Sequence, residues 1–216
     1  MNRNEVFSCV DHTLLKAAST FEEVKILCEE ALRYHAASVC IPPSFVKRVK
    51  QAFGERLTIC TVVGFPLGYH TSDCKIFEAR QAVLEGADEI DMVVNLGDVK
   101  EGNFQRITEE IRGVKSAIKG KLLKVIVETC YLSEAEKVAL CKCVTEGGAD
   151  FIKTSTGFGT QGAALEDVEL MKKHIGENVK IKAAGGIRTR EDMERFIEAG
   201  CARIGASSAV KALFSE

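Results

Sequence analysis

Two lysines that close apolar, strand-like runs are the residues best placed to do chemistry in this sequence. Lys153 lies in segment 151–157, FIKTSTG, where an apolar entry is followed by hydroxyl residues and glycine. Lys182 lies in segment 179–186, VKIKAAGG, with small residues and glycine after it. A lysine in a partly dry pocket has more free amine, the form that attacks carbonyls, and a second nearby cation acts in the same direction. The pair therefore predicts a Schiff-base site.

Each lysine taken alone has a simpler interpretation, since single lysines more often extend to water beside a carboxylate. Two acids favour chemistry here, because Asp91 lies inside the run 88–95 and Asp11 ends the run 6–11. A Schiff-base reaction transfers protons when a carbinolamine loses water and when an enamine gains or loses a proton. We predict Asp91 and Lys182 as the proton-transfer pair. An ion pair that only fixes the interior is the alternative for Asp91.

Eight apolar runs have the composition of strands, and helical stretches lie between most of them. The runs are 6–11, 37–41, 58–64, 88–95, 123–129, 150–155, 179–184 and 202–206. This alternation, with no break in composition, predicts an α/β fold: a (β/α)8 TIM barrel in which residues 1–216 form a single compact domain. An open doubly wound sheet is the structural alternative.

Helix boundaries are marked by capping residues at the start and by glycine at the end. Pairs with the spacing of a capping box are Ser19 with Glu22, Ser133 with Glu136, and Thr189 with Asp192. Glycine or alanine closes a helix and leads into the next strand in segments 84–88, 146–150 and 198–202. A helical apolar stripe that indicates core packing consists of Ile107, Ile111, Val114 and Ile118. The helix–loop–strand unit is therefore repeated.

The barrel hypothesis places the active site at the carboxyl ends of the strands. Segment 184–188, AGGIR, follows the seventh run, and segment 205–208, GASS, follows the eighth. Their backbone N–H groups can hold an anion, and these loops of a barrel often bind phosphate. Glycine pairs more often only allow a tight turn, and Ser207 and Ser208 can also be ordinary helix N-caps. Two such loops in neighbouring positions favour phosphate.

Composition excludes several other classes of function. Lys and Arg total 29 against 31 acids, so the net charge of −2 gives no basic field for nucleic acid or a membrane surface. Residues 1–5 lack the apolar core of a secretion signal, and no run approaches the roughly 20 apolar residues of a spanning helix. We expect a cytoplasmic protein. The nine scattered cysteines favour reduced thiols, and neither they nor the four histidines have metal-ligand spacing.

Several segments together resemble the deoxyribose-phosphate aldolase family. They are 11–15 (DHTLL), 89–95 (EIDMVVN), 151–157 (FIKTSTG), 182–187 (KAAGGI) and 205–208 (GASS). The similarity spans nearly the whole chain, and Lys-Thr-Ser-Thr-Gly followed by Lys-x-Ala-Gly-Gly is specific to the family. It implies a Schiff-base aldolase that interconverts 2-deoxy-D-ribose 5-phosphate with D-glyceraldehyde 3-phosphate and acetaldehyde, with no metal or organic cofactor.

The resemblance also implies a role for each matching residue. Lys153 corresponds to the Schiff-base lysine, and Asp91 and Lys182 to its proton-transfer pair. Residues that match positions contacting substrate or supporting the relay are Asp11, Thr13 and Thr156. Residues that match positions around the phosphate are Gly157, Gly185, Gly186, Gly205, Ser207 and Ser208. The implied partners are a phosphosugar and acetaldehyde.

One position departs from the family pattern. Some members carry a lysine directly after Lys-Thr-Ser-Thr-Gly, whereas this chain has Phe158. Phosphate binding is then expected to depend more on backbone amides and on Arg188 or Lys211. Cys40, at the end of the run 37–41, is interpreted as a packing residue.

Two other functions stay open at this point. The first is another Schiff-base sugar-phosphate aldolase or a transaldolase-like barrel. The second is a non-catalytic barrel that binds a phosphosugar and uses its lysines structurally. No element of the sequence marks an interface, but barrels of this size commonly pair, so we expect a homo-oligomer, either a dimer or a tetramer.

Overall fold

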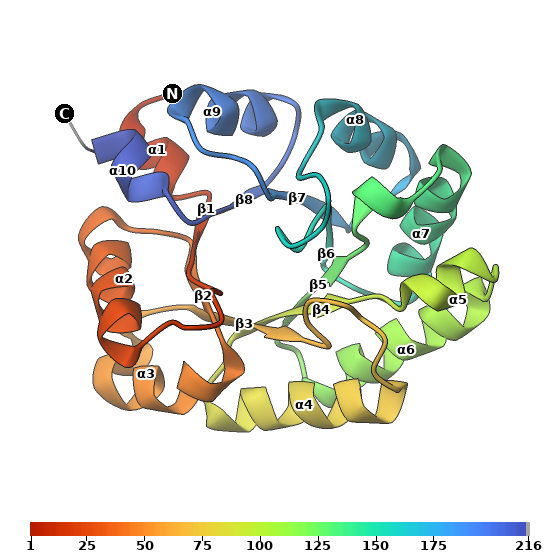
Figure 1. Cartoon of the computed structure of the whole chain (residues 1–216), viewed down its shortest axis with the longest axis horizontal. Coiled ribbons are helices and arrows are strands. Elements are labelled where there is room, and N and C mark those ends of the chain that lie inside the picture. Colours follow the sequence, from red (N-terminus) through yellow and green to blue (C-terminus); the bar gives the residue numbers. More distant parts are fainter. Residues whose placement is uncertain (215–216) are drawn as a thin grey trace.

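The computed structural model describes residues 1–214, which form a closed barrel of parallel strands inside a ring of helices (Figure 1). The strands pair in chain order, and the last pairs with the first. They are β1 (Val10–Thr13), β2 (Ser38–Ile41), β3 (Ile59–Val63), β4 (Glu89–Val93), β5 (Leu122–Ile126), β6 (Phe151–Lys153), β7 (Lys180–Ala184) and β8 (Arg203–Ala206). The predicted (β/α)8 barrel is confirmed, and the open sheet is not observed. The last two residues of the predicted domain, 215 and 216, lie outside the described part.

Helices cover the outer side of the barrel. They are α1 (Arg3–Phe7), α2 (Phe21–Tyr34), α3 (Val46–Phe53), α4 (Ser72–Glu85), α5 (Leu96–Lys100), α6 (Phe104–Ala117), α7 (Glu134–Glu146), α8 (Leu165–His174), α9 (Arg190–Glu198) and α10 (Ala209–Phe214), with short 3-10 turns η1 (Pro43–Phe45), η2 (Gly54–Arg56) and η3 (Thr129–Tyr131). The main apolar core lies between strands and helices. This core includes the predicted apolar stripe of α6, whose residues are at most 1% exposed: Ile107, Ile111, Val114 and, just after the helix, Ile118.

The inside of the barrel is unusual because it is charged. Barrel interiors are ordinarily filled with layers of Val, Ile and Leu. Here a separate small apolar cluster is built on Cys40, Cys60 and Val62. Next to it lie the buried charged side chains Asp11, Glu89, Asp91, Lys124, Lys153 and Lys182. Charges that are so costly to bury are a sign of a functional site.

Two predictions about the amino-terminal region are wrong. The run 6–11 is not one strand, because Asn2 and Glu5 form a capping box that starts α1, and β1 begins only at Val10. The cap of α2 is Thr20 paired with Glu23, one residue later than predicted. Both side chains of this pair bond to the backbone N–H of the other residue, so the pair satisfies two free donors at once.

The other capping predictions are confirmed. Ser133 and Thr189 are the N-caps of α7 and α9, each with its predicted acidic partner. At the end of α4, Gly86 has a φ of 113°, a left-handed conformation that favours glycine. All neighbouring strands are parallel, so every strand ends on the same side of the barrel.

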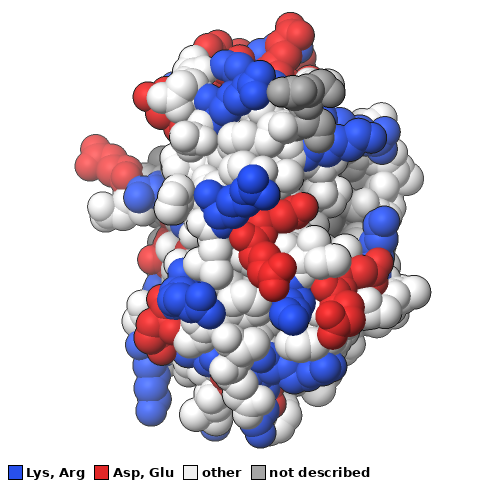
Figure 2. Space-filling model, turned by 90° about the vertical axis from the view of Figure 1, so that its left-hand side faces the viewer, with Lys and Arg blue, Asp and Glu red and all other residues white. Residues whose placement is uncertain are grey.

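The surface agrees with the balanced composition. Figure 2 shows the face that lies on the left of Figure 1, where acidic and basic side chains are interspersed. Within residues 1–214, no helix combines the length and the apolar character needed to cross a bilayer.

Candidate active site

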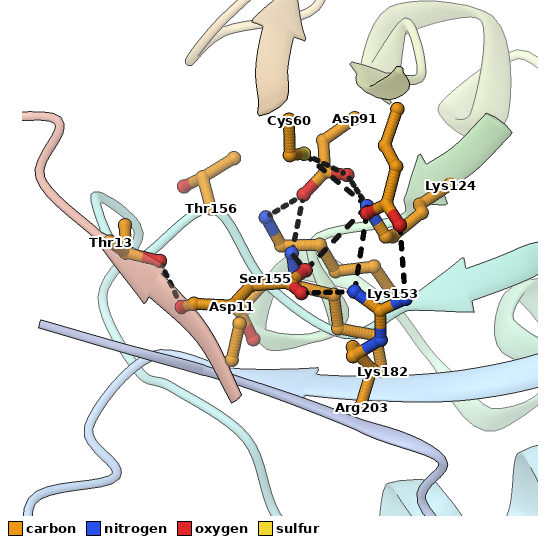
Figure 3. Close-up of polar contacts among 12 residues, drawn as sticks. Asp11, Thr13, Cys60, Asp91, Lys124, Lys153, Ser155, Thr156, Lys182 and Arg203 are labelled. Atoms are coloured by element: carbon orange, nitrogen blue, oxygen red, sulfur yellow. Dashed lines mark hydrogen bonds and ion pairs between the residues drawn. The ribbon is translucent and has the colours of Figure 1, made fainter. Parts of the chain in front are cut away.

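Asp91 on β4 is the centre of a buried ion network (Figure 3). Its Oδ2 accepts hydrogen bonds from Nζ of Lys153 at 2.8 Å and Nζ of Lys182 at 2.7 Å. Its Oδ1 accepts from Nζ of Lys124 at 2.9 Å and from Sγ of Cys60 at 3.1 Å. The two lysines predicted from the sequence therefore meet at one carboxylate oxygen.

Two further acids complete the network. Asp11 on β1 accepts from the amine of Lys182, from the guanidinium of Arg203, and from Oγ of Ser38 at 2.8 Å. Glu89 accepts from Nζ of Lys124 at 2.6 Å and from Nη2 of Arg203 at 3.0 Å. Every charge in this interior is paired, as buried charges must be.

Strand register explains why these residues meet. Neighbouring strands align Lys153 with Lys182, Lys182 with Arg203, and Asp91 with Lys124 as Cα partners. Side chains at such paired positions lie on the same face of a sheet, here the inner face. Gly205 leaves room for one of them, because a Cβ there would lie 3.3 Å from Cε of Lys182.

Both aspartates are held as carboxylates. Burial alone raises the pKa of Asp91, but the lysine ammoniums, led by that of Lys124, outweigh burial and hold this pKa well below its ordinary value. Burial is likewise the largest influence on Asp11, and the combined cations, led by Lys182, hold the pKa of Asp11 well below its ordinary range. The resting site therefore supplies proton acceptors.

Three of the cations are held charged. Burial lowers the pKa of Lys182, but Asp11 and Asp91 outweigh burial and raise that pKa well above its ordinary value. Burial also lowers the pKa of Lys124 and of Arg203, but nearby acids outweigh it and raise both values. The strongest of these acids is Asp91 for Lys124 and Asp11 for Arg203. These three groups keep their protons near neutral pH.

A charge count singles out the fourth cation. The network contains three acids, Asp11, Glu89 and Asp91, and each is matched by one of the three cations that stay charged. The remaining amine, Lys153, is therefore in excess, because each acid keeps a cationic partner without it. A free amine is what nucleophilic attack on a carbonyl requires.

The low pKa of Asp11 predicts how folding depends on pH. A carboxyl group whose folded pKa is depressed stabilises the fold fully above its ordinary value of 3.8, and this contribution is lost as pH falls toward the folded value. We expect the free energy of unfolding to fall below about pH 4, and to fall less steeply in an Asp11→Asn variant that is already less stable at neutral pH. Urea unfolding at several pH values measures this. The control is Glu55→Gln, which changes an exposed acid paired with Lys50. An equal slope in wild type and Asp11→Asn would contradict this account.

A cavity of about 270 Å³ opens above the network at the carboxyl ends of the strands. Of the charged interior residues, Lys153 alone lines it. Predicted site residues in its wall are Thr13, Thr156, Gly157, Gly185, Gly186, Gly205 and Ser207. The structure therefore brings the Schiff-base candidate and the predicted phosphate loops to one pocket.

Backbone conformation shapes the phosphate side of this cavity. Gly185 and Gly186 have φ values of 86° and 76°, which other residues rarely adopt. Gly162 approaches Gly185 so closely that a Cβ on Gly162 would lie 2.1 Å from the carbonyl oxygen of Gly185. The N–H of Ala163 also donates to that oxygen at 3.1 Å. The loops after β6 and β7 thus pack on each other and fix the wall.

Some sequence predictions fall outside the cavity. Ser208 does not line it and lies directly before α10. Lys211, within α10, does not line it either, whereas Arg188 does and Lys16 is a cation that the sequence analysis missed. Cys40 is fully buried beside Cys60, in agreement with its interpretation as a packing residue.

Three charged members of the network were also missed. Lys124, Glu89 and Arg203 each interrupt or begin an otherwise apolar strand run. A charge at the inward-facing position of a buried strand is a usable signal, because it must meet a counter-charge. Such a charge predicts that an oppositely charged residue lies on a neighbouring strand, but it does not identify that residue.

Among residues 1–214, two clusters have ligand atoms close enough to hold a metal ion, namely Cys40 with Cys60 and Asp91, and Asp11 with Cys60 and Glu89. Both include Sγ of Cys60, which lies 3.3 Å from the ammonium of Lys124. The same ammonium contacts Asp11, Glu89 and Asp91, so a cation already lies against both clusters.

Comparison with known proteins decides the family. A model described as DeoC/LacD family aldolase matches residues 6–212. The chain belongs to this family. A deoxyribose-phosphate aldolase from Clostridium botulinum is 56% identical over all of this chain and 98% of its own length. One from Clostridioides difficile is 56% identical over 98% of this chain and 96% of its own length.

A solved structure agrees with these relatives. Deoxyribose phosphate aldolase from Aeropyrum pernix, described as a unique tetramer, superimposes with a TM-score of 0.90 at 31% identity, over 99% of this chain and 92% of that chain. For this member of the family, the relatives favour aldolase chemistry. They do not favour the transaldolase-like enzyme or the non-catalytic phosphosugar barrel that the sequence left open.

Proposed function

We propose that this chain is a Schiff-base aldolase that reversibly cleaves 2-deoxy-D-ribose 5-phosphate to D-glyceraldehyde 3-phosphate and acetaldehyde, in the breakdown of deoxyribose phosphates. The observation that carries the proposal is Lys153, the one amine of the buried network that lines the cavity. The activities named for the relatives support the substrate. The test is acetaldehyde release from the sugar phosphate, and folded protein that releases none would contradict the proposal.

The first half of the reaction forms the Schiff base. In the cleavage direction, the neutral amine of Lys153 adds to the aldehyde carbon of the open-chain sugar, and the carbinolamine loses water to give an iminium. Asp91, held as a carboxylate 2.8 Å from this amine, accepts protons. Lys182, held charged 2.7 Å from the same oxygen, donates them and is itself bonded to Asp11.

The second half breaks the carbon–carbon bond. The hydroxyl on the third carbon loses its proton to the relay, the bond between carbons two and three breaks, and its electron pair forms an enamine on Lys153. Glyceraldehyde 3-phosphate is thereby released. The enamine regains a proton at its terminal carbon, and water then frees acetaldehyde and the amine. Asp91 and Lys182 change protonation in opposite directions, so the network returns to its resting charge.

We propose that the loops after β6, β7 and β8 form the phosphate site where they line the cavity. Its backbone donors are supplied by Gly157, Gly185, Gly186, Gly205 and Ser207, which line the cavity together. Lys16 and Arg188 also line the cavity and can provide positive charge, whereas the residue after Gly157 is the uncharged Phe158.

Arg188→Ala is expected to raise KM for deoxyribose 5-phosphate by roughly tenfold, because one charge-assisted hydrogen bond is lost. Turnover of unphosphorylated deoxyribose should not change. The control is Lys211→Ala, which removes an equal charge outside the cavity and should leave both substrates unaffected. Steady-state kinetics with the two sugars measures this. An equal effect of Arg188→Ala on both sugars would place the phosphate elsewhere.

We further propose that residues 1–216 act as one domain, in the cytoplasm, as a homo-oligomer. The tetrameric Aeropyrum relative supports assembly. On α4, Phe77 and Leu84 are 68% and 76% exposed and lie seven residues apart, on one face of the helix. Large apolar groups exposed together favour a contact with another chain. Light scattering of the purified protein distinguishes dimer, tetramer and monomer.

A further inference from the structure

Glu128, two residues after the end of β5, is a buried carboxylate in an uncommon backbone conformation. Its φ of 56° and ψ of 66° lie in the left-handed region, which non-glycine residues rarely adopt. Its side chain is deeply buried, the residue being 3% exposed. Among residues 1–214, its carboxylate oxygens bond to a single residue, Thr156, through the backbone N–H at 3.1 Å and through the hydroxyl. In the described part of the chain, no lysine or arginine forms an ion pair with this acid, so its position calls for another explanation.

The hydroxyl of Thr156 takes part in two hydrogen bonds, one as donor and one as acceptor. It donates its proton to Oε2 of Glu128. A backbone N–H only donates, so Oγ1 of Thr156 accepts from the N–H of Phe158 at 3.0 Å. A hydroxyl has one proton and two lone pairs. Thr156, which lines the cavity, therefore has one lone pair and no proton left for a ligand.

Thr13, which also lines the cavity, likewise uses its hydroxyl proton within the protein. Its hydroxyl donates to the carbonyl oxygen of Asp11 at 2.7 Å, and that carbonyl can only accept. Both threonines of the wall thus offer lone pairs, which bind groups that donate a proton.

The backbone of Gly159 packs against the side chain of Glu128. Gly159 lies against the carboxylate, and a Cβ there would be 3.2 Å from Oε1 of Glu128 and 2.8 Å from Sγ of Cys130. The N–H of Thr129 also donates to the carbonyl oxygen of Thr154 at 2.9 Å. The segment after β6 therefore contacts both Glu128 and its neighbour Thr129.

We propose that Glu128 sets the hydrogen-bond polarity of the cavity, making Thr156 an acceptor that selects an aldehyde with a hydroxyl beside its carbonyl. The inference rests on the proposed function. In glyceraldehyde 3-phosphate, the hydroxyl-bearing carbon lies between the reacting carbon and the phosphate. Along the sequence, Thr156 lies between Lys153 and Gly157, and all three line the cavity. Lys153 carries the reacting amine, and Gly157 belongs to the proposed phosphate loops. Glu128 is a positioning residue that acts through Thr156.

Glu128→Gln tests this because its orientation is forced. The amide oxygen must face the N–H of Thr156, since the amide NH2 would oppose another donor there. The NH2 group then donates to Oγ1 of Thr156, which already accepts from Phe158, and the hydroxyl proton turns to the cavity. The substitution therefore converts Thr156 from an acceptor into a donor with almost no change of shape.

The measurement compares kcat/KM for acetaldehyde addition to glyceraldehyde 3-phosphate and to its 2-deoxy-2-fluoro analogue, whose fluorine cannot donate. Wild type is expected to prefer the hydroxyl compound, and Glu128→Gln to reduce this preference by roughly tenfold, the effect of one hydrogen bond. Intrinsic reactivity of the two aldehydes cancels when the variant is compared with wild type. A role of Glu128 in folding alone would lower both rates and leave their ratio unchanged.

A second pair of variants keeps the test decisive if Glu128→Gln does not fold. Thr156→Ala removes the acceptor and should lose the preference, whereas Thr156→Ser keeps the hydroxyl and should retain it. An unchanged ratio in Glu128→Gln, or in Thr156→Ala, overturns the inference. Wild type that does not turn over glyceraldehyde 3-phosphate contradicts the proposed function instead, so the two failures are distinguishable.

Discussion

Lys153→Ala is expected to lower retro-aldol turnover of deoxyribose 5-phosphate by at least about a thousandfold, the scale of losing a covalent nucleophile. Lys182 cannot replace it, because Asp11 and Asp91 raise the pKa of Lys182 and it is fully buried. Neither does Lys182 line the cavity. The measurement is acetaldehyde release, coupled to its reduction by a dehydrogenase.

The control for this prediction is Lys173→Ala, which removes an exposed lysine of α8 and should keep wild-type turnover. Circular dichroism and the melting temperature establish that the Lys153 variant is folded. Folded Lys153→Ala that retains a tenth of wild-type turnover would show that another group forms the bond.

Asp91→Asn is expected to affect both stability and activity. Asp91 accepts from three lysines, and the neutral amide leaves their buried charges poorly compensated. Removing one partner of a buried ion pair costs about 3–5 kcal/mol of the free energy of unfolding. Loss of the proton acceptor should also lower kcat by about 10²–10⁴-fold, the usual contribution of general acid–base catalysis. Urea unfolding and steady-state kinetics measure the two effects.

The matched comparison is Lys153→Met at the other end of the same hydrogen bond. Because Lys153 is the surplus cation of the network, replacing it with an apolar chain of similar length should leave the free energy of unfolding unchanged or raise it. Both variants are expected to lose activity, but only Asp91→Asn is expected to lose stability. Equal destabilisation by Asp91→Asn and Lys153→Met would contradict the charge count.

The catalytic candidates could be predicted from the sequence because an apolar run shows where a strand ends and which of its residues face inward. Lys153, Lys182, Asp91 and Asp11 each lie in or at the end of an apolar run, and a barrel brings such positions together. Asp91 and Lys182 were predicted as partners and are hydrogen-bonded, but the other partners were not predictable. Their identity depends on which strands align, as with Lys182 and Arg203, and register is a property of the closed sheet.

Local chemistry explains the errors and omissions. Adjacent Ser19 and Thr20 both offer a capping hydroxyl, and a matching acid follows each of them at the same spacing, so the pattern alone does not choose between them. Glu128 was not recognised, since its left-handed backbone and its bond to Thr156 are set by packing after the strand ends. Ser208 was grouped with Ser207, although only Ser207 faces the cavity.

Borohydride reduction in the presence of acetaldehyde, followed by peptide mass spectrometry, tests the central claim most directly. If Lys153 forms the Schiff base, the peptide that contains it gains the mass of C2H4, because an ethyl group replaces one hydrogen of the amine, and the modification maps to Lys153 alone. Wild type is predicted to be labelled in this way, whereas in Lys153→Ala no lysine of the buried network is predicted to be labelled. A label on Lys182, or none on folded and active protein, would contradict the account.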